Sequence, residues 1–393
     1  MRIKLKDAFE LQIGKTPSRN KSEYWNGVYK WVSISDIGNS EKYVYSTREL
    51  ITYKGIIDSG IKVIPKGTVI MSFKLSIGKT AITTEDMYTN EAIVAFIDKK
   101  KIPIDIDYLY YLCSGSNWMQ GVNKAVMGLT LNKATLSEKE INIPNIEIQK
   151  KCAGNLDKID RIIDLKKQQL DQLDLLVRSL FIEMFGDPIS NPQKWKVKRL
   201  VELSTLITNG TTPSGGSENY IDSGVVFLRS QNVWKNRIDL EDTVYISSRL
   251  HKVMNKSRVV YNDILITKTG RINTENSSLG RAAIYKEKNK EANINGHVYL
   301  IRLKDIVNSE YILSILTGEA YRDYIRRVCV GGIDKRQINL NHVEDFPIIV
   351  PPLDLQNRFA DYVSSIDKSK LAVKKSLEEL EILKKSLMQK YFA

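Results

Sequence analysis

Side chains that can hydrogen-bond to DNA gather in glycine-punctuated loops in two separated parts of the chain. Arg and Lys recognise guanine, Asn and Gln recognise adenine, and Lys, Arg, Ser and Thr bind phosphate oxygens. The first group is Lys15, Thr16, Ser33, Ser35, Lys74, Ser76 and Lys79. The second group is Thr212, Arg229, Ser230, Gln231, Asn232, Lys268, Arg271, Asn276 and Arg281. We expect base contacts from Lys74, Lys79, Arg229, Gln231, Arg271 and Arg281; the alternative is that most of these residues are solvated surface residues.

Motifs that would give the chain a catalytic, nucleotide or metal site are missing from the sequence. Gly-Lys-Thr occurs at Gly14 and Gly78, but Phe9 and Phe73 stand where a phosphate-binding loop requires its first glycine. There is no Gly-x-Gly-x-x-Gly, His-Glu-x-x-His or Asp/Asn-Pro-Pro-aromatic string, and the histidines are scattered at His251, His297 and His342. We therefore predict a protein that is not an enzyme, with no catalytic residue, no metal site and no cofactor.

The overall charge favours a polyanionic partner. The formal net charge is +13 at pH 7, and the pI is about 9.3, which is typical of a protein that binds nucleic acid. Three widely spaced cysteines without a Cys-x-x-Cys pair suit a reducing cytosol. No apolar run is long enough for a signal peptide or a membrane span. We expect a cytoplasmic protein that binds double-stranded DNA and no membrane.

One sequence is repeated twice along the chain. Gly14-Lys15-Thr16-Pro17-Ser18 recurs 196 residues later as Gly210-Thr211-Thr212-Pro213-Ser214. Towards the end of each copy the offset becomes 207 residues, from Gln149 to Gln356. A chance similarity would not hold register over so many elements. The copies therefore span about 1–186 and 197–393.

Each copy divides into a mixed module and a long helix, so the predicted fold class is α+β. Short apolar runs indicate strands, and a proline precedes each long helix, where proline is tolerated. The predicted organisation is a first recognition module at 1–145, a helix at 146–186, a connector at 187–196, a second module at 197–352 and a helix at 353–393.

The two predicted helices carry apolar residues at alternating spacings of four and three, which is typical of a coiled-coil seam. Only Lys166, Lys370 and Lys384 interrupt the two seams. Each helix would be about 57 Å long and cannot bury its seam alone. We expect the two helices to pair as an antiparallel coiled coil with pseudo-two-fold symmetry. The alternative is that each helix packs separately on its own module.

The order of these motifs resembles that of the specificity subunits of type I restriction-modification systems. Each copy opens with the Gly-x-Thr-Pro-Ser turn, passes through a strand of the type Asn262-Asp263-Ile264-Leu265-Ile266, and reaches a Gly-Lys or Gly-Arg turn at Gly78 or Gly280. Pro351-Pro352-Leu353 through Gln356 then begins the second helix, and Phe185-Gly186-Asp187-Pro188 follows the first. No single motif is specific, but their duplicated order is, and it covers nearly the whole chain.

The resemblance implies two target recognition domains, each reading one half of a split, asymmetric DNA site. It also implies partners: two methyltransferase (modification) subunits and, through them, restriction subunits. Because major-groove readout from one face of a duplex repeats about every 34–36 Å, the predicted coiled coil could set the spacing between half-sites. Alternatives are a specificity subunit of a standalone modification system, a coiled-coil adaptor that binds protein, and an enzyme with an unfamiliar motif.

Overall fold

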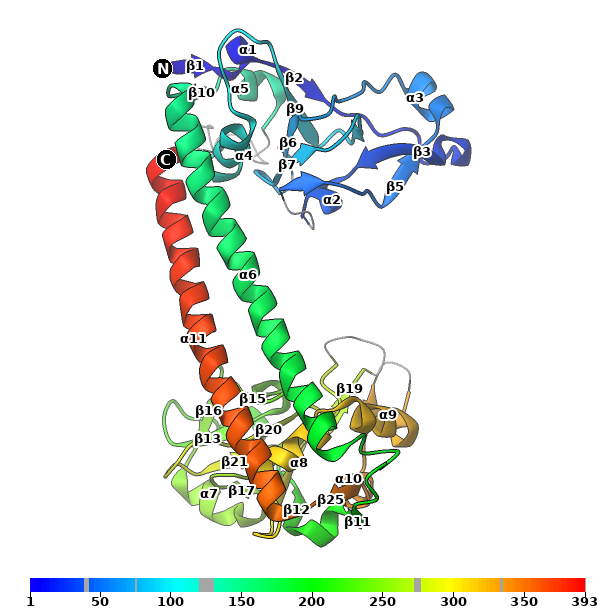
Figure 1. The fold of residues 1–393 in the computed structure, drawn as a ribbon, viewed down its shortest axis with the longest axis vertical. Coiled ribbons are helices and arrows are strands. Elements are labelled where there is room, and N and C mark those ends of the chain that lie inside the picture. Colours follow the sequence, from blue (N-terminus) through cyan, green and yellow to red (C-terminus); the bar gives the residue numbers. More distant parts are fainter. Residues whose placement is uncertain (39–41, 75, 120–130, 272–276, 333–334, 393) are drawn as a thin grey trace. The chain divides into compact units, whose positions relative to one another are not determined.

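The computed structural model describes residues 1–38, 42–74, 76–119, 131–271, 277–332 and 335–392. Its contacts divide the chain into two compact units. Unit 1 comprises Met1–Lys167 and Lys375–Ala393, and unit 2 comprises Gln168–Lys374. Each unit holds one mixed module, and each of two long helices contributes a segment to both units (Figure 1).

In unit 1, the larger sheet has the strand order β2-β9-β6-β7-β4 and the smaller sheet the order β5-β3-β8, while β1 pairs with β10. The pairs β4–β7 and β3–β8 are parallel, and the others are antiparallel. The strands are β1 Arg2–Lys4, β2 Phe9–Ile13, β3 Trp25–Val32, β4 Tyr43–Val44, β5 Glu49–Ile51, β6 Val69–Ser72, β7 Thr80–Thr83, β8 Tyr88–Thr89, β9 Ile93–Asp98 and β10 Glu140–Asn142. The short helices are α1 Leu5–Ala8, η1 Ser22–Tyr24, α2 Ile34–Gly38, α3 Tyr53–Ser59, α4 Ile106–Gly115 and α5 Lys133–Ser137.

In unit 2, the two main sheets have the orders β12-β22-β18-β20 and β16-β13-β21-β17. Their strands are β12 Ser204–Asn209, β13 Val225–Leu228, β16 Val244–Ile246, β17 Arg258–Val259, β18 Ile264–Thr267, β20 Ala282–Ile284, β21 Ala292–Ile294 and β22 Val298–Leu303. Smaller sheets are formed by β11 Lys196–Arg199, β14 Val233–Trp234, β15 Arg237–Ile238, β19 Thr269–Gly270, β23 Val330–Gly331, β24 Arg336–Gln337 and β25 Pro347–Val350. The helices of this module are η2 Leu200–Leu203, η3 Gly216–Asn219, η4 Ser230–Asn232, α7 Ser248–Val253, η5 Asn255–Ser257, α8 Ser309–Leu316, α9 Glu319–Val328 and α10 Leu340–Glu344.

The two modules repeat one topology, as the sequence duplication predicts. The order β2-β9-β6-β7 of unit 1 corresponds to β12-β22-β18-β20 of unit 2, and β5-β3-β8 corresponds to β16-β13-β21. The strand β3 in unit 1 and the strand β13 in unit 2 each pair antiparallel on one side and parallel on the other. The expectation of tandem modules with mixed helix and sheet is therefore confirmed.

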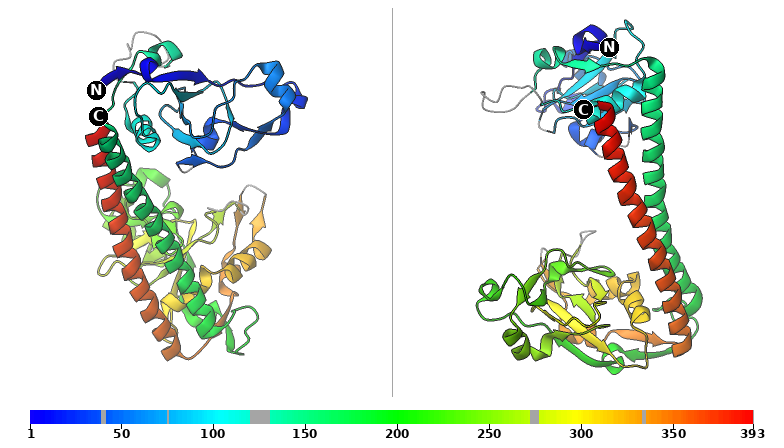
Figure 2. Two further views of the ribbon diagram at one scale, coloured as in Figure 1. Left: turned by 45° about the horizontal axis from the view of Figure 1, so that its top comes forward. Right: turned by 90° about the vertical axis from the view of Figure 1, so that its left-hand side faces the viewer.

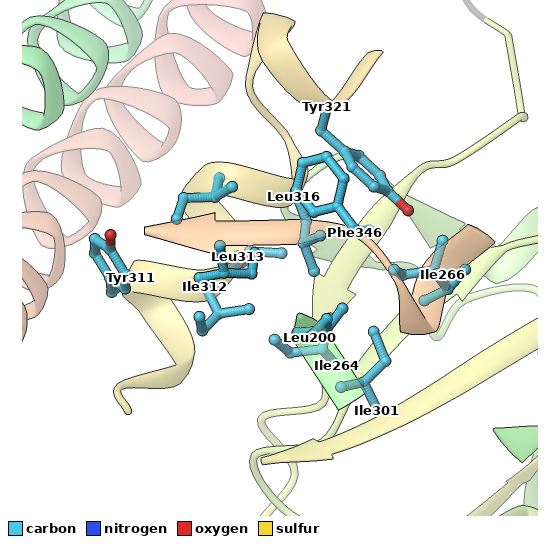
Figure 3. Close-up of a cluster of buried hydrophobic side chains, with 14 of the residues drawn as sticks. Leu200, Ile264, Ile266, Ile301, Tyr311, Ile312, Leu313, Leu316, Tyr321 and Phe346 are labelled. Carbon is cyan, nitrogen blue, oxygen red and sulfur yellow. The ribbon is translucent and has the colours of Figure 1, made fainter. Parts of the chain in front are cut away.

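The buried strand β18 lies between two hydrophobic clusters. Because side chains alternate along a strand, Ile264 and Ile266 enter one cluster and Leu265 enters the other. Figure 3 shows the first cluster, in which Leu200 and Phe346 lie with residues of α8 and with Tyr321 of α9. The strand β6 of unit 1 distributes its apolar side chains in the same way. Both modules are thus layered around a central strand buried on both faces.

The long helices are α6 Ile146–Phe185 and α11 Leu353–Phe392. A fully buried glutamine fixes the start of each helix to its module. Gln149 accepts a hydrogen bond from the N–H of Asp105 (2.8 Å) and donates to the carbonyls of Pro103 and Pro144. Gln356 accepts from the N–H of Asn308 (2.9 Å) and donates to the carbonyl of Pro351. The repeated proline and glutamine therefore fix the start of both long helices in the same way.

Each unit contains contacts between α6 and α11, which run side by side there in opposite directions (Figures 1 and 2). In unit 1, Lys384 forms an ion pair with Asp160. In unit 2, Lys370 lies 2.6 Å from Asp174, and Phe181 packs against Phe359. The two lysines that interrupt the seam of α11 are thus paired with carboxylates of α6. Among the described residues, no helix is long and apolar enough to cross a membrane.

Candidate nucleic-acid interface

The loops predicted to bind DNA in unit 1 meet at one backbone junction. The N–H of Gly14 donates to the carbonyl of Ile93 (3.2 Å), and that of Lys15 donates to Thr89 (2.9 Å). Beside them, the N–H of Asn90 donates to Val32 (3.0 Å). A Cβ on Gly14 would lie 2.1 Å from the carbonyl oxygen of Thr89, so only glycine fits this approach.

The same junction recurs in unit 2. The N–H of Gly210 donates to the carbonyl of Val298 (2.9 Å), that of Thr211 donates to Ile294 (3.1 Å), and that of Asn295 donates to Leu228 (3.0 Å). A Cβ on Gly210 would lie 2.0 Å from the carbonyl oxygen of Asn295. Both modules therefore bring their Gly-x-Thr-Pro-Ser turn close to the end of the strand that leads into the next candidate loop, at Val32 before Ser33 and at Leu228 before Arg229.

A short turn in each module is held by the side chain of its fourth residue. In unit 1, Asp36 accepts hydrogen bonds from the N–H (2.7 Å) and the hydroxyl (2.6 Å) of Ser33. In unit 2, Asn232 accepts from the N–H of Arg229 (2.8 Å) and donates to the carbonyls of Asp239 and Asp242. Asn232 is only 1% exposed. Its side chain therefore fixes the turn that presents Arg229 and Gln231.

Beyond Ser33 and Lys15, the candidates of unit 1 divide into tethered and exposed side chains. The hydroxyl of Thr16 donates to Glu91, and this hydrogen bond is the main reason that the pKa of Glu91 is lowered. Lys74 places its ammonium 5.5 Å from the ring centroid of Phe73. Ser76, Lys79 and Ser35 are exposed. A Cβ on Gly38 would lie 2.5 Å from Nζ of Lys79, so this lysine reaches the end of α2.

In unit 2, one acidic residue orients two of the candidates. Arg229 donates to the carbonyl of Asp242 (2.8 Å) and lies 3.3 Å from its carboxylate, and Gln231 donates to the same carboxylate (2.6 Å). Lys268 lies 5.6 Å from the ring centroid of Tyr299. The remaining candidates Thr212 and Arg271 are exposed, Ser230 is partly buried, and Asn276 lies outside the described residues.

Arg281 is positioned by a residue that no sequence pattern indicated. Its guanidinium carbon lies 4.0 Å from the ring centroid of Trp234, and Nε donates to the carbonyl of Ser277 (2.9 Å). Burial, followed by the charge of Arg322, lowers the pKa of Arg281. Trp234 and Arg322 were missed because they lie 47 and 41 residues from Arg281 in the chain, and only the fold brings them near.

A comparable stack in unit 1 was also missed. Arg19 follows the Gly-x-Thr-Pro-Ser turn, and its guanidinium carbon lies 3.9 Å from the ring centroid of Trp25. Arg19 also forms a two-nitrogen hydrogen-bonded pair with Glu49. Its position beside the turn is the only sequence signal that could have drawn attention to it.

Histidine and carboxylate side chains form no metal-binding group among the described residues. His251 is buried against Asn293 and Glu291, and His342 accepts from the N–H of Asn339 (3.2 Å). These two side chains therefore have structural partners. What the junctions can do chemically is to present cations, amides and hydroxyls in two separate sets.

Comparison with known proteins shows which family has this duplicated organisation. A model described as the type I restriction modification DNA specificity domain matches residues 1–175 and 192–382. The type I restriction enzyme MjaIX specificity subunit of Methanocaldococcus jannaschii is 26% identical over 408 residues, covering 98% of this chain and 91% of the relative. The EcoprrI specificity subunit of Escherichia coli is 28% identical over 114 residues, which is 28% of each chain.

Solved structures of low sequence identity share the fold. A chain from a type I R-M system, described for its complex assembly and conformational transition, has a TM-score of 0.65 at 17% identity, covering 100% of this chain and 97% of that one. The type I restriction-modification S subunit from M. genitalium has a TM-score of 0.54 at 14% identity, covering 100% and 96%. Because two matches of the family model together cover most of the chain, this protein belongs to the type I restriction-modification DNA specificity family.

Proposed function

We propose that this chain is the specificity subunit of a type I restriction-modification enzyme and that it reads a bipartite, asymmetric DNA site. The observation that carries the proposal is the duplicated loop junction, in which one backbone arrangement presents two different sets of side chains. Because different side chains at equivalent positions recognise different bases, the two half-sites should differ in sequence. The modules assigned to these half-sites are residues 1–145 and 197–352.

The candidate residues have different roles in this proposal. Lys74 and Lys79 in the first module, and Arg229, Gln231, Arg271 and Arg281 in the second, contact base edges. Phosphate oxygens are bound by Lys15, Thr16, Ser33, Ser35, Ser76, Thr212, Ser230 and Lys268, and Asn276 is a further DNA-binding residue. Asn232 acts through the turn that it holds, because burial leaves its amide no access to DNA.

The helices α6 and α11 pair as an antiparallel coiled coil that sets the spacing between half-sites. Two ion pairs, one within each unit, support a single register. From Asp160 to Asp174 the chain advances 14 residues along α6, and from Lys384 to Lys370 their partners retreat 14 residues along α11. Insertion of one heptad in each helix keeps the seam in phase and adds about 10 Å. The unread spacer should then lengthen by about three base pairs.

Modification and restriction subunits complete the proposed enzyme. The relatives named above are specificity subunits of type I restriction enzymes. Apolar side chains on the outer faces of the helices, Leu175, Leu176 and Leu383, remain exposed, and such exposed apolar surface marks a protein contact. We propose that these faces bind two methyltransferase subunits, through which restriction subunits attach. The complex would act on DNA in the cytoplasm.

Selection from random duplexes tests the assignment of half-sites. The full chain, co-purified with its methyltransferase, should enrich a split motif. Substitution of Lys74 and Lys79 by Ala should relax only one half of this motif, and substitution of Arg229 and Gln231 should relax only the other. The exposed Lys252 and Lys288, replaced by Ala, serve as controls of equal charge change for the first pair. Relaxation of both halves by either double variant, or a continuous motif, would contradict the proposal.

A further inference from the structure

A turn of unit 2 concentrates positive charge around one partly exposed tryptophan. The strands β14 and β15 form a hairpin that contains Trp234, Lys235 and Arg237. The guanidinium carbon of Arg281 lies 4.0 Å from the Trp234 ring centroid, and that of Arg237 lies 5.8 Å from it. Trp234 is 37% exposed. Stacking on an aromatic ring holds a guanidinium in a fixed place and leaves its edge able to donate hydrogen bonds.

The helix α9 brings a further cation to the same place. A Cβ on Gly280 would lie 2.2 Å from Cδ1 of Ile325, so α9 packs directly against the residue that precedes Arg281. Arg322 lies one turn earlier on α9. Burial, followed by the charge of Arg322, lowers the pKa of Arg281. Burial, followed by the charges of Arg178 and Arg322, lowers the pKa of Lys235. We call Trp234, Lys235, Arg237, Arg281 and Arg322 the Trp234 cation cluster.

In the Trp234 cation cluster, Arg237 lies 3.9 Å from Asp239, whereas Lys235 and Arg322 have no such ion pair among the described residues. Among the residues that the structure describes, no carboxylate lies within 4.0 Å of a side-chain nitrogen of Lys235 or Arg322, whereas the neighbouring Arg178 lies 4.0 Å from Glu319. Arg178, Lys235 and Arg237 line one cavity of about 720 Å³ within unit 2, and the carboxylates of Asp174 and Glu319 also line it. Bringing like charges together is unfavourable until an anion binds, so the arrangement is suited to an anionic ligand.

We propose that Lys235 and Arg322 of the Trp234 cation cluster bind backbone phosphate of the DNA beside the half-site assigned to the second module, while Arg281 keeps the base contact proposed above. The inference rests on the proposed function and extends it to residues outside the predicted loops. The hairpin begins directly after η4, which carries Gln231, so duplex that reaches Gln231 has its backbone within reach of the hairpin. Lysine and arginine side chains that contact phosphate oxygens fix the position of the protein on the duplex and carry no base preference.

In unit 1, the cation at the position that corresponds to the hairpin is neutralised by carboxylates. Lys42 directly precedes β4, which pairs with β7 of the larger sheet. In the chain, β4 follows the turn that contains Asp36, as the β14–β15 hairpin follows the turn that contains Asn232. Its ammonium lies 2.8 Å from Asp107 and 2.5 Å from Asp157. These two carboxylates neutralise Lys42 within the protein. We therefore expect the phosphate contact on the second module to have no equivalent at Lys42.

Salt dependence of DNA binding tests the proposal. Variants Lys235→Gln and Arg322→Gln, singly and combined, are compared in the full chain co-purified with its methyltransferase. The control combines Arg249→Gln and Lys252→Gln, exposed cations of α7 that carry the same charge change. The combined variant should weaken binding to cognate and unrelated duplexes by the same factor. Its log–log salt slope should become less negative by about 0.9 for each phosphate that the variant no longer binds.

Methylphosphonate substitution locates the phosphate without relying on the variants alone. Neutral linkages placed one at a time beside the second half-site should weaken the parent protein at one or two positions, and should not weaken the combined variant further. An unchanged salt slope, or a loss confined to the cognate duplex, would overturn the proposal. If the parent itself shows no sequence preference, the proposed function fails; if the parent is selective and the variants match it, only the cluster assignment fails.

Discussion

Replacing Asn232 by Asp changes one atom in a buried turn and tests how the second module presents its base-reading residues. The carboxylate would still accept from the N–H of Arg229, but it could not donate to the carbonyls of Asp239 (3.1 Å) and Asp242 (2.8 Å). Each buried group left without its partner costs about 1–3 kcal/mol. We therefore expect about 2–4 kcal/mol of destabilisation of unit 2, since neighbouring losses are not fully additive.

Differential scanning calorimetry measures this loss, and DNA selection measures its functional effect. At about 2–4 °C for each kcal/mol in a unit of 150–250 residues, the transition of unit 2 should move down by roughly 4–16 °C. Asn289→Asp at an exposed turn adds the same charge and should leave the transition in place. The half-site read by Arg229 and Gln231 should relax while the other stays sharp. An unshifted transition would refute the role given to the Asn232 amide.

Three further predictions concern other parts of the structure. Gly210→Ala places a methyl group 2.0 Å from a carbonyl oxygen, so it should lower the urea midpoint of unit 2 and relax the sequence preference at one half-site. The control is Gly216→Ala, where nothing lies within 4 Å of the added methyl group but φ is +55°. This variant should cost only about 1 kcal/mol of stability. Gln356→Leu leaves the N–H of Asn308 without its partner and should destabilise unit 2 by about 1–3 kcal/mol in urea unfolding; a neutral effect would contradict the anchoring role of this glutamine. Burial raises the pKa of both Tyr285 and Tyr299 to about 12. The neutral phenols therefore stabilise the fold below the unfolded pKa of about 10, and this stability should be lost as the pH rises through about 10 to 12. A phenolate absorbance titration in which every tyrosine ionises near about 10 would be inconsistent with their burial.

The duplicated architecture could be predicted from the sequence because its signals are local and repeated. The turn at Gly14 and Gly210 marks a backbone approach that admits no side chain, and Gln149 and Gln356 mark the helix starts. Apolar runs, which form strands buried on both faces, indicated the mixed fold class. These features depend on residue type at fixed spacing, which can be detected in a sequence.

The detailed chemistry of the interface could not be predicted, because it depends on partners distant in the chain. Asn232 is a polar residue of the kind expected on an exposed loop. It is nevertheless buried, and its amide donates to the carbonyls of Asp239 and Asp242. Arg281 depends on Trp234, whose hairpin is held beside it by the hydrogen bond from the N–H of Asn236 to the carbonyl of Ala282 (2.9 Å). The lysines that interrupt the seam of α11 are explained by their ion pairs with carboxylates of α6, which the sequence pattern does not indicate.

Methylation-sensitive sequencing of host DNA, after co-expression of this chain with its proposed methyltransferase subunit, tests the central claim most directly. We predict a split asymmetric motif with an unread spacer, in which exchange of the base-reading residues of one module alters one half and leaves the other unchanged. A short continuous motif, or methylation that does not depend on this chain, would contradict the claim.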